Sequence, residues 1–308
     1  MRYAYYPGCS LQSGAKEYDL STRAVFAKLG IELVEIADWS CCGAVHAEGR
    51  ANINLSARNL ALAEVQGMTT IVAPCSGCYL NLRRAAKTVV SGKKMRQQIN
   101  AELPGELQIT ADIEVLHPLY LLIEEYGLEK IRAQVTHPLT GLRVASYYGC
   151  MLTRPKDRFD SPEKPKGLDE LMRVLGAEVV AFPYQSKCCG GALAISHSDV
   201  TAKLSGKVLG SAQERGAEVV TLGCPMCHTA LDLYQHKAER ALKQTLDLPI
   251  LYFTQLMGLA LGIDEEQLGL NRHIVSTAPV VARVSEEARK REGDKARKRE
   301  GEKARVVV

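Results

Sequence analysis

The ten cysteines of this 308-residue chain form two copies of one five-cysteine pattern, and this duplication constrains the fold more than any other feature. Each copy has a single cysteine, then an adjacent pair followed by glycine, then a Cys-x-x-Cys motif. Corresponding cysteines lie 141 to 149 residues apart, so we predict two similar domains that each gather five thiols. The first set comprises Cys9, Cys41, Cys42, Cys75 and Cys78, and the second comprises Cys150, Cys188, Cys189, Cys224 and Cys227.

The length of the chain also suits two domains. Domains usually contain about 100 to 200 residues, and 46% of this chain is hydrophobic, which is enough for two ordinary cores. We predict an N-terminal domain at residues 1–138, a C-terminal domain at 139–272 and a charged tail at 273–308. The boundary between the two domains is expected near residues 136–141.

In both halves, short strands alternate with amphipathic helices, and the cysteine groups follow strands. Such an alternation predicts parallel βαβ units, hence two Rossmann-like α/β domains. Ligands of parallel sheets gather beyond the carboxyl ends of the strands, where the cysteines are expected. The predicted strands are Arg2–Tyr6, Ile31–Ile36, Thr69–Ala73, Arg143–Tyr148, Glu178–Phe182 and Glu218–Leu222. The predicted helices are Ser21–Leu29, Ala51–Gln66, Leu116–Tyr126, Leu168–Leu175, Val200–Arg215 and Thr254–Leu261.

Charge and hydropathy argue against nucleic-acid binding and against insertion into a membrane. The net charge of +4 comes from residues 283–308, and the rest of the chain is balanced. No segment reaches about 18 uninterrupted apolar residues, and the N-terminus lacks an export signal. We therefore expect a cytoplasmic protein. In a reducing compartment, patterned cysteines are more typical of metal ligands or redox groups than of disulfides.

Five thiols in each set need an explanation, because four complete a zinc site or a cubane iron-sulfur cluster. Adjacent cysteines on a strand point to opposite faces, so each pair must lie in a turn, which the following glycine permits. Three alternatives remain open: structural zinc in one copy, a thioredoxin-like dithiol at Cys75 and Cys78, and a haem attachment motif at Cys224-Pro-Met-Cys227-His228. The dithiol leaves Cys9, Cys41 and Cys42 unexplained, and the haem motif has Tyr79 in place of its histidine in the first copy and lacks support from an export signal.

The repeated Cys…Cys-Cys-Gly…Cys-x-x-Cys pattern resembles the cysteine-rich CCG domains of the heterodisulfide reductase B-subunit family. The resemblance extends to about Asn271, and both copies of the motif are complete. It implies that each five-cysteine set binds a non-cubane 4Fe-4S cluster and that the two clusters lie at the domain interface. It also implies that all ten cysteines are cluster ligands and that a disulfide is split between the clusters.

The resemblance implies an oxidoreductase that acts on sulfur groups, as the catalytic iron-sulfur subunit of a heterodisulfide-reductase-like complex. The chain has neither a ferredoxin-type cysteine run nor a dinucleotide-binding glycine motif. Electrons are therefore expected from a partner, and the resemblance implies that this partner is a ferredoxin-like iron-sulfur subunit linked to a flavin-containing subunit. The substrate is expected to be a small disulfide or thiol. An electron-relay subunit without its own sulfur substrate, or a subunit of a sulfur-oxidising complex, would have the same architecture.

Residues that flank the cysteines give weaker signals. His46 and Lys187 are candidates for proton transfer or for binding an anionic substrate, although single residues of these types beside a motif are commonly ordinary polar groups. Two tyrosines precede the first cysteine of each set, and all four are expected to pack around the clusters: Tyr5, Tyr6, Tyr147 and Tyr148.

Overall fold

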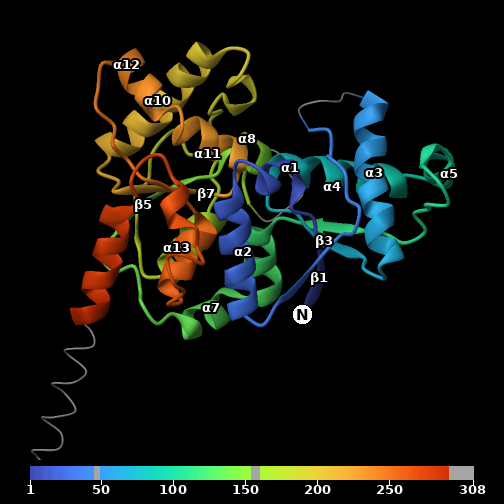
Figure 1. Cartoon of the computed structure of the whole chain (residues 1–308), viewed down its shortest axis with the longest axis horizontal. Helices are drawn as coiled ribbons and strands as arrows, with labels where there is room; N and C mark the ends of the chain where they lie inside the picture. The colour runs from blue at the N-terminus through green and yellow to red at the C-terminus, as the bar shows by residue number, and fades with distance from the viewer. Residues whose placement is uncertain (45–48, 154–159, 291–308) are drawn as a thin grey trace, which may run out of the picture.

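The computed structural model describes residues 1–44, 49–153 and 160–290, which form two halves with one parallel sheet each (Figure 1). The strand order of the first sheet is β2-β1-β3-β4, and that of the second is β6-β5-β7-β8. All pairs within the two sheets are parallel. The strands are β1 (Arg2–Tyr5), β2 (Glu32–Glu35), β3 (Thr70–Val72), β4 (Glu114–Leu116), β5 (Arg143–Tyr147), β6 (Glu178–Val179), β7 (Val219–Leu222) and β8 (Ile250–Tyr252).

Helices connect these strands and cover the sheets. The N-terminal half contains α1 (Gly8–Gln12), α2 (Lys16–Lys28), α3 (Gly49–Val65), α4 (Ser76–Val90), α5 (Lys93–Glu102), α6 (Pro118–Tyr120), the π-helix η1 (Leu121–Tyr126) and α7 (Leu128–Gln134). The C-terminal half contains α8 (Gly149–Thr153), α9 (Gly167–Val174), the 3-10 helix η2 (Gly191–Leu193), α10 (Ser198–Glu214), α11 (Pro225–Leu231), α12 (Gln235–Leu242), α13 (Phe253–Ala260) and the 3-10 helix η3 (Leu270–Arg272). A further helix covers residues 278–290.

The predicted fold class, two similar α/β domains with parallel sheets, is confirmed. The fourth strand of each sheet was not predicted, because each runs directly into a helical segment: β4 ends at Leu116, where the predicted helix begins, and β8 is followed at once by α13. No helix was predicted at Cys9 or Cys150, which lie on the short helices α1 and α8. The predicted helix Leu116–Tyr126 is a short α-helical turn followed by η1.

The two halves pack closely through α2 and α13, which lie side by side between the sheets (Figure 1). The rings of Tyr18 and Tyr252 stack across this interface with their centroids 4.1 Å apart. Close to them, the hydroxyls of Ser21 and Thr254 form a buried hydrogen bond of 2.7 Å. Because these groups are buried and paired, the interface holds the carboxyl ends of both sheets in a defined relative position.

The C-terminal segment packs on the second half more extensively than a charged tail would. Val275, Val280 and Val284 are buried, and Thr277 donates a hydrogen bond to the carbonyl of Leu270. In the described residues, the beginning of the segment predicted as a tail is thus part of the folded body. Residues 291–308 lie outside the described residues, and the predicted division of the chain stays a prediction.

Candidate functional site

The first cysteine set converges from three places in the sequence. Cys75 is the N-cap residue of α4, and Cys78 lies in the first turn of that helix. The Sγ atoms of Cys42 and Cys78 share a hydrogen bond of 3.2 Å, and Cys9 on α1 lies close enough to Cys41 to contribute to the raised pKa of that thiol. Two helix starts and the loop between them thus place these thiols together, as the sequence predicted.

The second set is arranged in the same way. Cys150, Cys188, Cys189, Cys224 and Cys227 all line one cavity of about 60 Å³. The Sγ atoms of Cys189 and Cys227 lie 3.4 Å apart. The structure therefore brings together all five thiols that the second copy of the motif predicted.

The two sets meet at the interface between the halves. The thiols of Cys75 and Cys224, the first cysteines of the two Cys-x-x-Cys motifs, lie close enough across the interface for each to shift the pKa of the other. Each of these residues is only 4% exposed. The two thiol sets therefore meet at a buried contact, while Cys9 and Cys188, one cysteine of each set, are exposed.

Three side chains of the N-terminal half hold the second set against the first by donating hydrogen bonds to one carbonyl. The carbonyl oxygen of Gly223, directly before Cys224, accepts from the Tyr18 hydroxyl (3.4 Å), the Ser76 hydroxyl (3.2 Å) and His117 Nε2 (3.0 Å). The Leu119 amide donates to His117 Nδ1, so the proton of this imidazole lies on Nε2. These groups position one cysteine set relative to the other.

Tyr18, Ser76 and His117 were not predicted from the sequence as positioning residues. Ser76 lies between two cysteines of a motif, and His117 directly follows β4, at the same sheet edge as the cysteines. The location of His117 after a strand was the one signal available, and it was lost because β4 was not recognised.

Where two thiols of these sets interact, the pKa of one cysteine is lowered and the pKa of its partner is raised. The hydrogen bond to Cys78, assisted by backbone amides and opposed by burial, lowers the pKa of Cys42 to about 7, and it raises the pKa of Cys78 well above its usual value. Hydrogen bonds to Cys227 and Cys75 lower the pKa of Cys224, whereas the bond to Cys224 raises that of Cys75. Thiolates this close repel one another, so all of them can ionise together only beside a cation.

Backbone amides also suit negatively charged sulfur. The amide of Gly43 donates to Cys41 Sγ at 3.4 Å, and the amide of Gly190 donates to Cys188 Sγ at 3.4 Å. In the second set the Gly191 amide additionally donates to Cys189 Sγ at 3.3 Å. Soft sulfur donors with amide hydrogen bonds fit a thiolate-ligated metal centre, iron-sulfur or zinc.

A glycine at the same place in each copy leaves room for the last cysteine of the set. Gly8 and Gly149 begin α1 and α8 with φ values of +72° and +68°. A Cβ atom on Gly8 would lie 3.1 Å from Cys78 Sγ, and one on Gly149 would lie 3.2 Å from Cys227 Sγ. These are tighter than ordinary contacts, so the glycines are needed both for the backbone conformation and for the space around sulfur.

Of the four tyrosines, Tyr6 and Tyr147 occupy equivalent places. The hydroxyl of Tyr6 donates to the carbonyl of Ser40 at 2.7 Å, and that of Tyr147 donates to the carbonyl of Lys187 at 2.6 Å. Each carbonyl belongs to the residue before a vicinal cysteine pair. Burial, with the nearby thiolates, raises the pKa of both phenols, so they stay protonated and hold these turns in place.

The two weaker candidates, His46 and Lys187, have different outcomes. His46 lies outside the described residues. Lys187 is exposed, and it lines a cavity of about 510 Å³ together with Cys188, Gln185 and Ser186. The lysine is therefore next to a thiol that solvent can reach.

A second group of possible metal ligands lies at the C-terminal end of α11. The ligand atoms of His228, Asp232 and His273 lie within 4.8 Å of one another. Both carboxylate oxygens of Asp232, however, accept backbone N–H groups, those of Ile274 and Val275. The carboxylate is thus already satisfied within the protein.

Hydrogen bonds also determine the proton positions of the two histidines. The Gln255 side-chain oxygen accepts from the Tyr252 amide, so its NH₂ group faces His273 Nε2 at 2.8 Å. That nitrogen must be an acceptor, and the proton of His273 then lies on Nδ1, 3.0 Å from His228 Nε2. A nitrogen that carries a proton does not bind a metal, so this cluster is a structural hydrogen-bond network.

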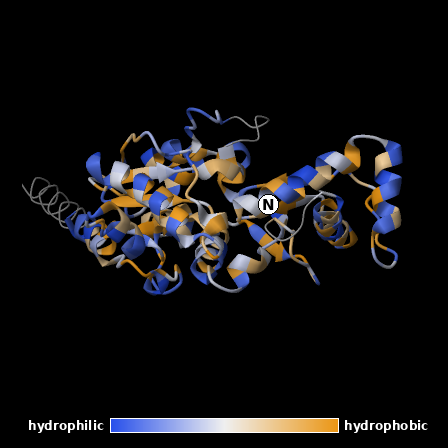
Figure 2. Ribbon diagram, turned by 90° about the horizontal axis from the view of Figure 1, so that it is seen from above, coloured by the Kyte–Doolittle hydropathy of each residue, from blue (hydrophilic) through white to orange (hydrophobic). Residues whose placement is uncertain are grey.

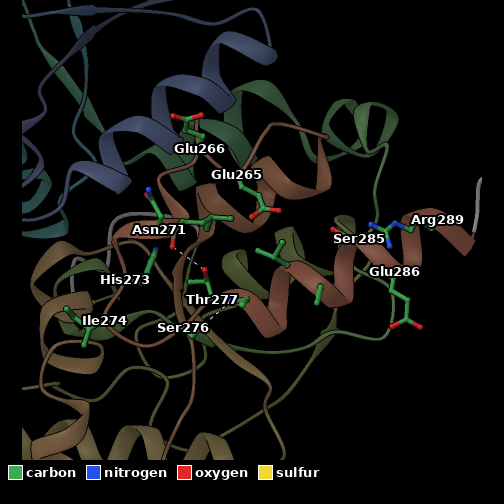
Figure 3. Close-up of a pocket in the computed structure, with 14 residues that line it drawn as sticks. Glu265, Glu266, Asn271, His273, Ile274, Ser276, Thr277, Ser285, Glu286 and Arg289 are labelled. Atoms are coloured by element: carbon green, nitrogen blue, oxygen red, sulfur yellow. Dashed lines mark hydrogen bonds between the residues drawn. The ribbon is translucent and has the colours of Figure 1, made fainter.

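A groove of about 900 Å³ lies apart from the cysteines, between the segment 265–277 and the helix 278–290 (Figure 3). Glu265, Glu266, Glu286 and Arg289 are among the side chains around it. None of the described cysteines lines this groove. The thiol chemistry is therefore located at the smaller, buried site.

Fold and site together define a duplicated parallel α/β protein with two facing thiol sites, each suited to a metal centre. The chain belongs to the family of proteins with the cysteine-rich CCG domain, which matches residues 3–83 and 144–232. The two matches coincide with the two cysteine sets. The resemblance to the B subunits of heterodisulfide reductases is confirmed by homologues over most of the chain.

Two curated proteins illustrate the range of relatives. The 8-methylmenaquinol:fumarate reductase membrane anchor subunit of Wolinella succinogenes is 37% identical over 279 residues, covering 89% of this chain and 96% of that protein. The B subunit of the ferredoxin/F(420)H(2)-dependent CoB-CoM heterodisulfide reductase of Methanosarcina acetivorans is 29% identical over 296 residues, covering 92% and 97%. Both are named as subunits of reductases.

A solved structure shares the fold. A hypothetical protein from Helicobacter pylori superposes with a TM-score of 0.72 at 16% identity, covering 90% of this chain. This chain spans about half, 52%, of that protein. Among the described residues, no helix combines the length and the apolar character that crossing a bilayer requires.

Proposed function

We propose that the chain is a redox subunit of a multisubunit reductase, that it holds one 4Fe-4S cluster in each cysteine set, and that it reduces or forms a disulfide between the two sets. The observation that carries this proposal is the meeting of two complete five-thiol sets at Cys75 and Cys224. By the resemblance, the clusters are of the non-cubane type and all ten cysteines are ligands. When bound, such clusters supply electrons one at a time.

The proposed reaction explains why two sites are needed. Cleavage of one S–S bond consumes two electrons and two protons and yields two thiols, and each site supplies one electron. The residues of this chain contribute the geometry: Tyr18, Ser76 and His117 hold the sets face to face, and burial excludes water from the facing edges. Lys187 is placed to bind an anionic group of a small disulfide or thiol that enters the cavity beside Cys188.

Electrons are proposed to come from a ferredoxin-like iron-sulfur subunit that is linked to a flavin subunit of the same complex. The naming of the relatives as parts of larger reductases supports partner subunits of some kind. The predicted cytoplasmic location stays a prediction.

The second candidate function is an electron relay. It is favoured by the relative from Wolinella succinogenes, whose complex is named for quinol oxidation and fumarate reduction. In that case the two sites would pass electrons to another subunit and no sulfur compound would react with them.

Two anaerobic measurements test the proposal. Metal and sulfide analysis is expected to give about eight irons per chain. About four irons with one zinc would show that one set is structural, and a metal-free native protein would refute the proposal. Addition of small disulfides to the reduced protein is then expected to produce a substrate-dependent paramagnetic signal. Loaded protein without any such signal would favour the relay.

A further inference from the structure

Although basic and acidic residues balance over residues 1–282, one segment within this range is strongly basic. Between Glu64 and Glu102 the sequence contains no acidic residue and six basic ones: Arg83, Arg84, Lys87, Lys93, Lys94 and Arg96. All six lie on α4 and α5. The turn that joins these helices, residues 91 and 92, is flanked by Lys87 in the last turn of α4 and by Lys93 and Lys94 in the first turn of α5.

Three of these cations have no function in holding the fold together. Arg84, Lys93 and Lys94 are exposed and form no ion pair with any residue that the structure describes. By contrast, Arg96 is bound to Asp112 at 2.7 Å, and Arg83 donates to the Tyr79 hydroxyl at 2.8 Å. The positive charge of the three unpaired side chains is therefore available to a partner.

The two lysines occupy a position that is unfavourable for the stability of α5. Lys93 and Lys94 occupy the first turn of α5, which contains no acidic residue. The helix dipole disfavours cations there and favours anions. Selection for helix stability alone does not explain a lysine pair at this end of the helix.

The segment around this turn also carries exposed apolar surface and lies at an end of the molecule. Val90, the last residue of α4, is 46% exposed and lies between Lys87 and Lys93 in the sequence. Helix α5 lies at the end of the long axis that is opposite to the helix 278–290 (Figures 1 and 2). A flat surface can approach this end without contacting the cysteine sites.

We infer that this end of the molecule, the cationic turn formed by Arg84, Val90, Lys93 and Lys94, docks on the anionic headgroups of a phospholipid bilayer. Cations beside an exposed apolar side chain are the combination that binds membrane surfaces. A relative of nearly equal length is named a membrane anchor subunit, and no helix among the described residues could span a bilayer. Contact with the surface would reconcile these two facts. The inference is independent of which redox reaction the cysteine sites perform.

The test is cosedimentation of the whole protein with vesicles of equal parts phosphatidylglycerol and phosphatidylcholine, compared with phosphatidylcholine alone. The wild type is expected to bind only the anionic vesicles, reversibly and less tightly as salt is raised. The triple variant Arg84→Gln, Lys93→Gln, Lys94→Gln is expected to bind about a hundredfold more weakly, because each cation near the surface contributes about fivefold.

Two controls separate this surface from general electrostatics. The variant Lys28→Gln, Lys203→Gln, Lys207→Gln makes the same charge change at exposed positions elsewhere and is expected to bind as the wild type does. A chain that ends after Lys290 lacks the charged C-terminal residues and is also expected to keep its affinity. Equal weakening in both triple variants, loss of binding on truncation alone, or no binding by the wild type would each overturn the inference. Iron content, measured in parallel, reports separately on the proposed function.

Discussion

The glycines that precede the first cysteine of each set offer the most discriminating test of the site. Gly8→Ala places a methyl group 3.1 Å from Cys78 Sγ and 3.2 Å from the Tyr6 ring, and Gly149→Ala places one 3.2 Å from Cys227 Sγ. Each methyl must be accommodated by a shift of a few tenths of an ångström in groups that are themselves buried. Each variant is therefore expected to disturb its own cysteine set and leave the other intact.

Two costs contribute to the loss of stability. An alanine at a φ near +70° costs about 1–2 kcal/mol because its Cβ crowds the backbone. Overpacking of the thiol adds about 1–3 kcal/mol. Gly30 separates the two costs, because its φ is also +72° while a Cβ there would meet nothing within 4 Å. Gly30→Ala is expected to show the first cost only.

The assays are iron content after anaerobic reconstitution and the free energy of unfolding in denaturant. Gly8→Ala and Gly149→Ala are each expected to retain about half of the wild-type iron, since one 4Fe-4S cluster of two would be lost. Gly30→Ala is expected to retain all of it. Full iron content in both cysteine-site variants, or equal destabilisation in all three, would refute the argument that the space beside sulfur is what requires glycine.

Three further predictions concern the interface and the ligands. Burial lowers the pKa of His117 to about 4, so the unfolded state takes up a proton before the folded state does as the pH falls. The free energy of unfolding is therefore lost progressively between about pH 6.5 and 4, and the loss is about 2 kcal/mol at pH 5. His117→Gln should reduce that pH dependence in denaturation curves; an unchanged dependence would contradict it. Ser21→Ala should cost about 1–2 kcal/mol because it leaves the Thr254 hydroxyl unpaired, and adding Thr254→Val should restore part of the loss in a double-mutant cycle. Cys150→Ala should remove iron from the second set alone, as metal analysis would show; loss of all iron would mean that the sets are not separate sites.

Much of the architecture could be predicted because the duplicated pattern consists of cysteines and glycines, residue types that have few structural roles at such spacings. Two five-cysteine patterns, each following strand-like segments, predicted two parallel α/β units and the convergence of the thiols at the ends of the strands. Strands β4 and β8 were not predicted because each runs directly into a helical segment, so that no turn signal separates the strand from the helix. The helices α1 and α8 were not predicted because a proline or glycine before a cysteine looks like a loop.

The sequence by itself therefore determined which groups are present: two equivalent thiol sets, the glycines beside them and the sheets that carry them. Only the tertiary structure decided how the two sets are oriented. The Gly223 carbonyl accepts hydrogen bonds from Tyr18, Ser76 and His117, which are as many as 205 residues away along the chain, and no local pattern encodes such a meeting. Hydrogen bonds between remote groups depend on the packing of α2 against α13, which brings Cys75 and Cys224 into contact.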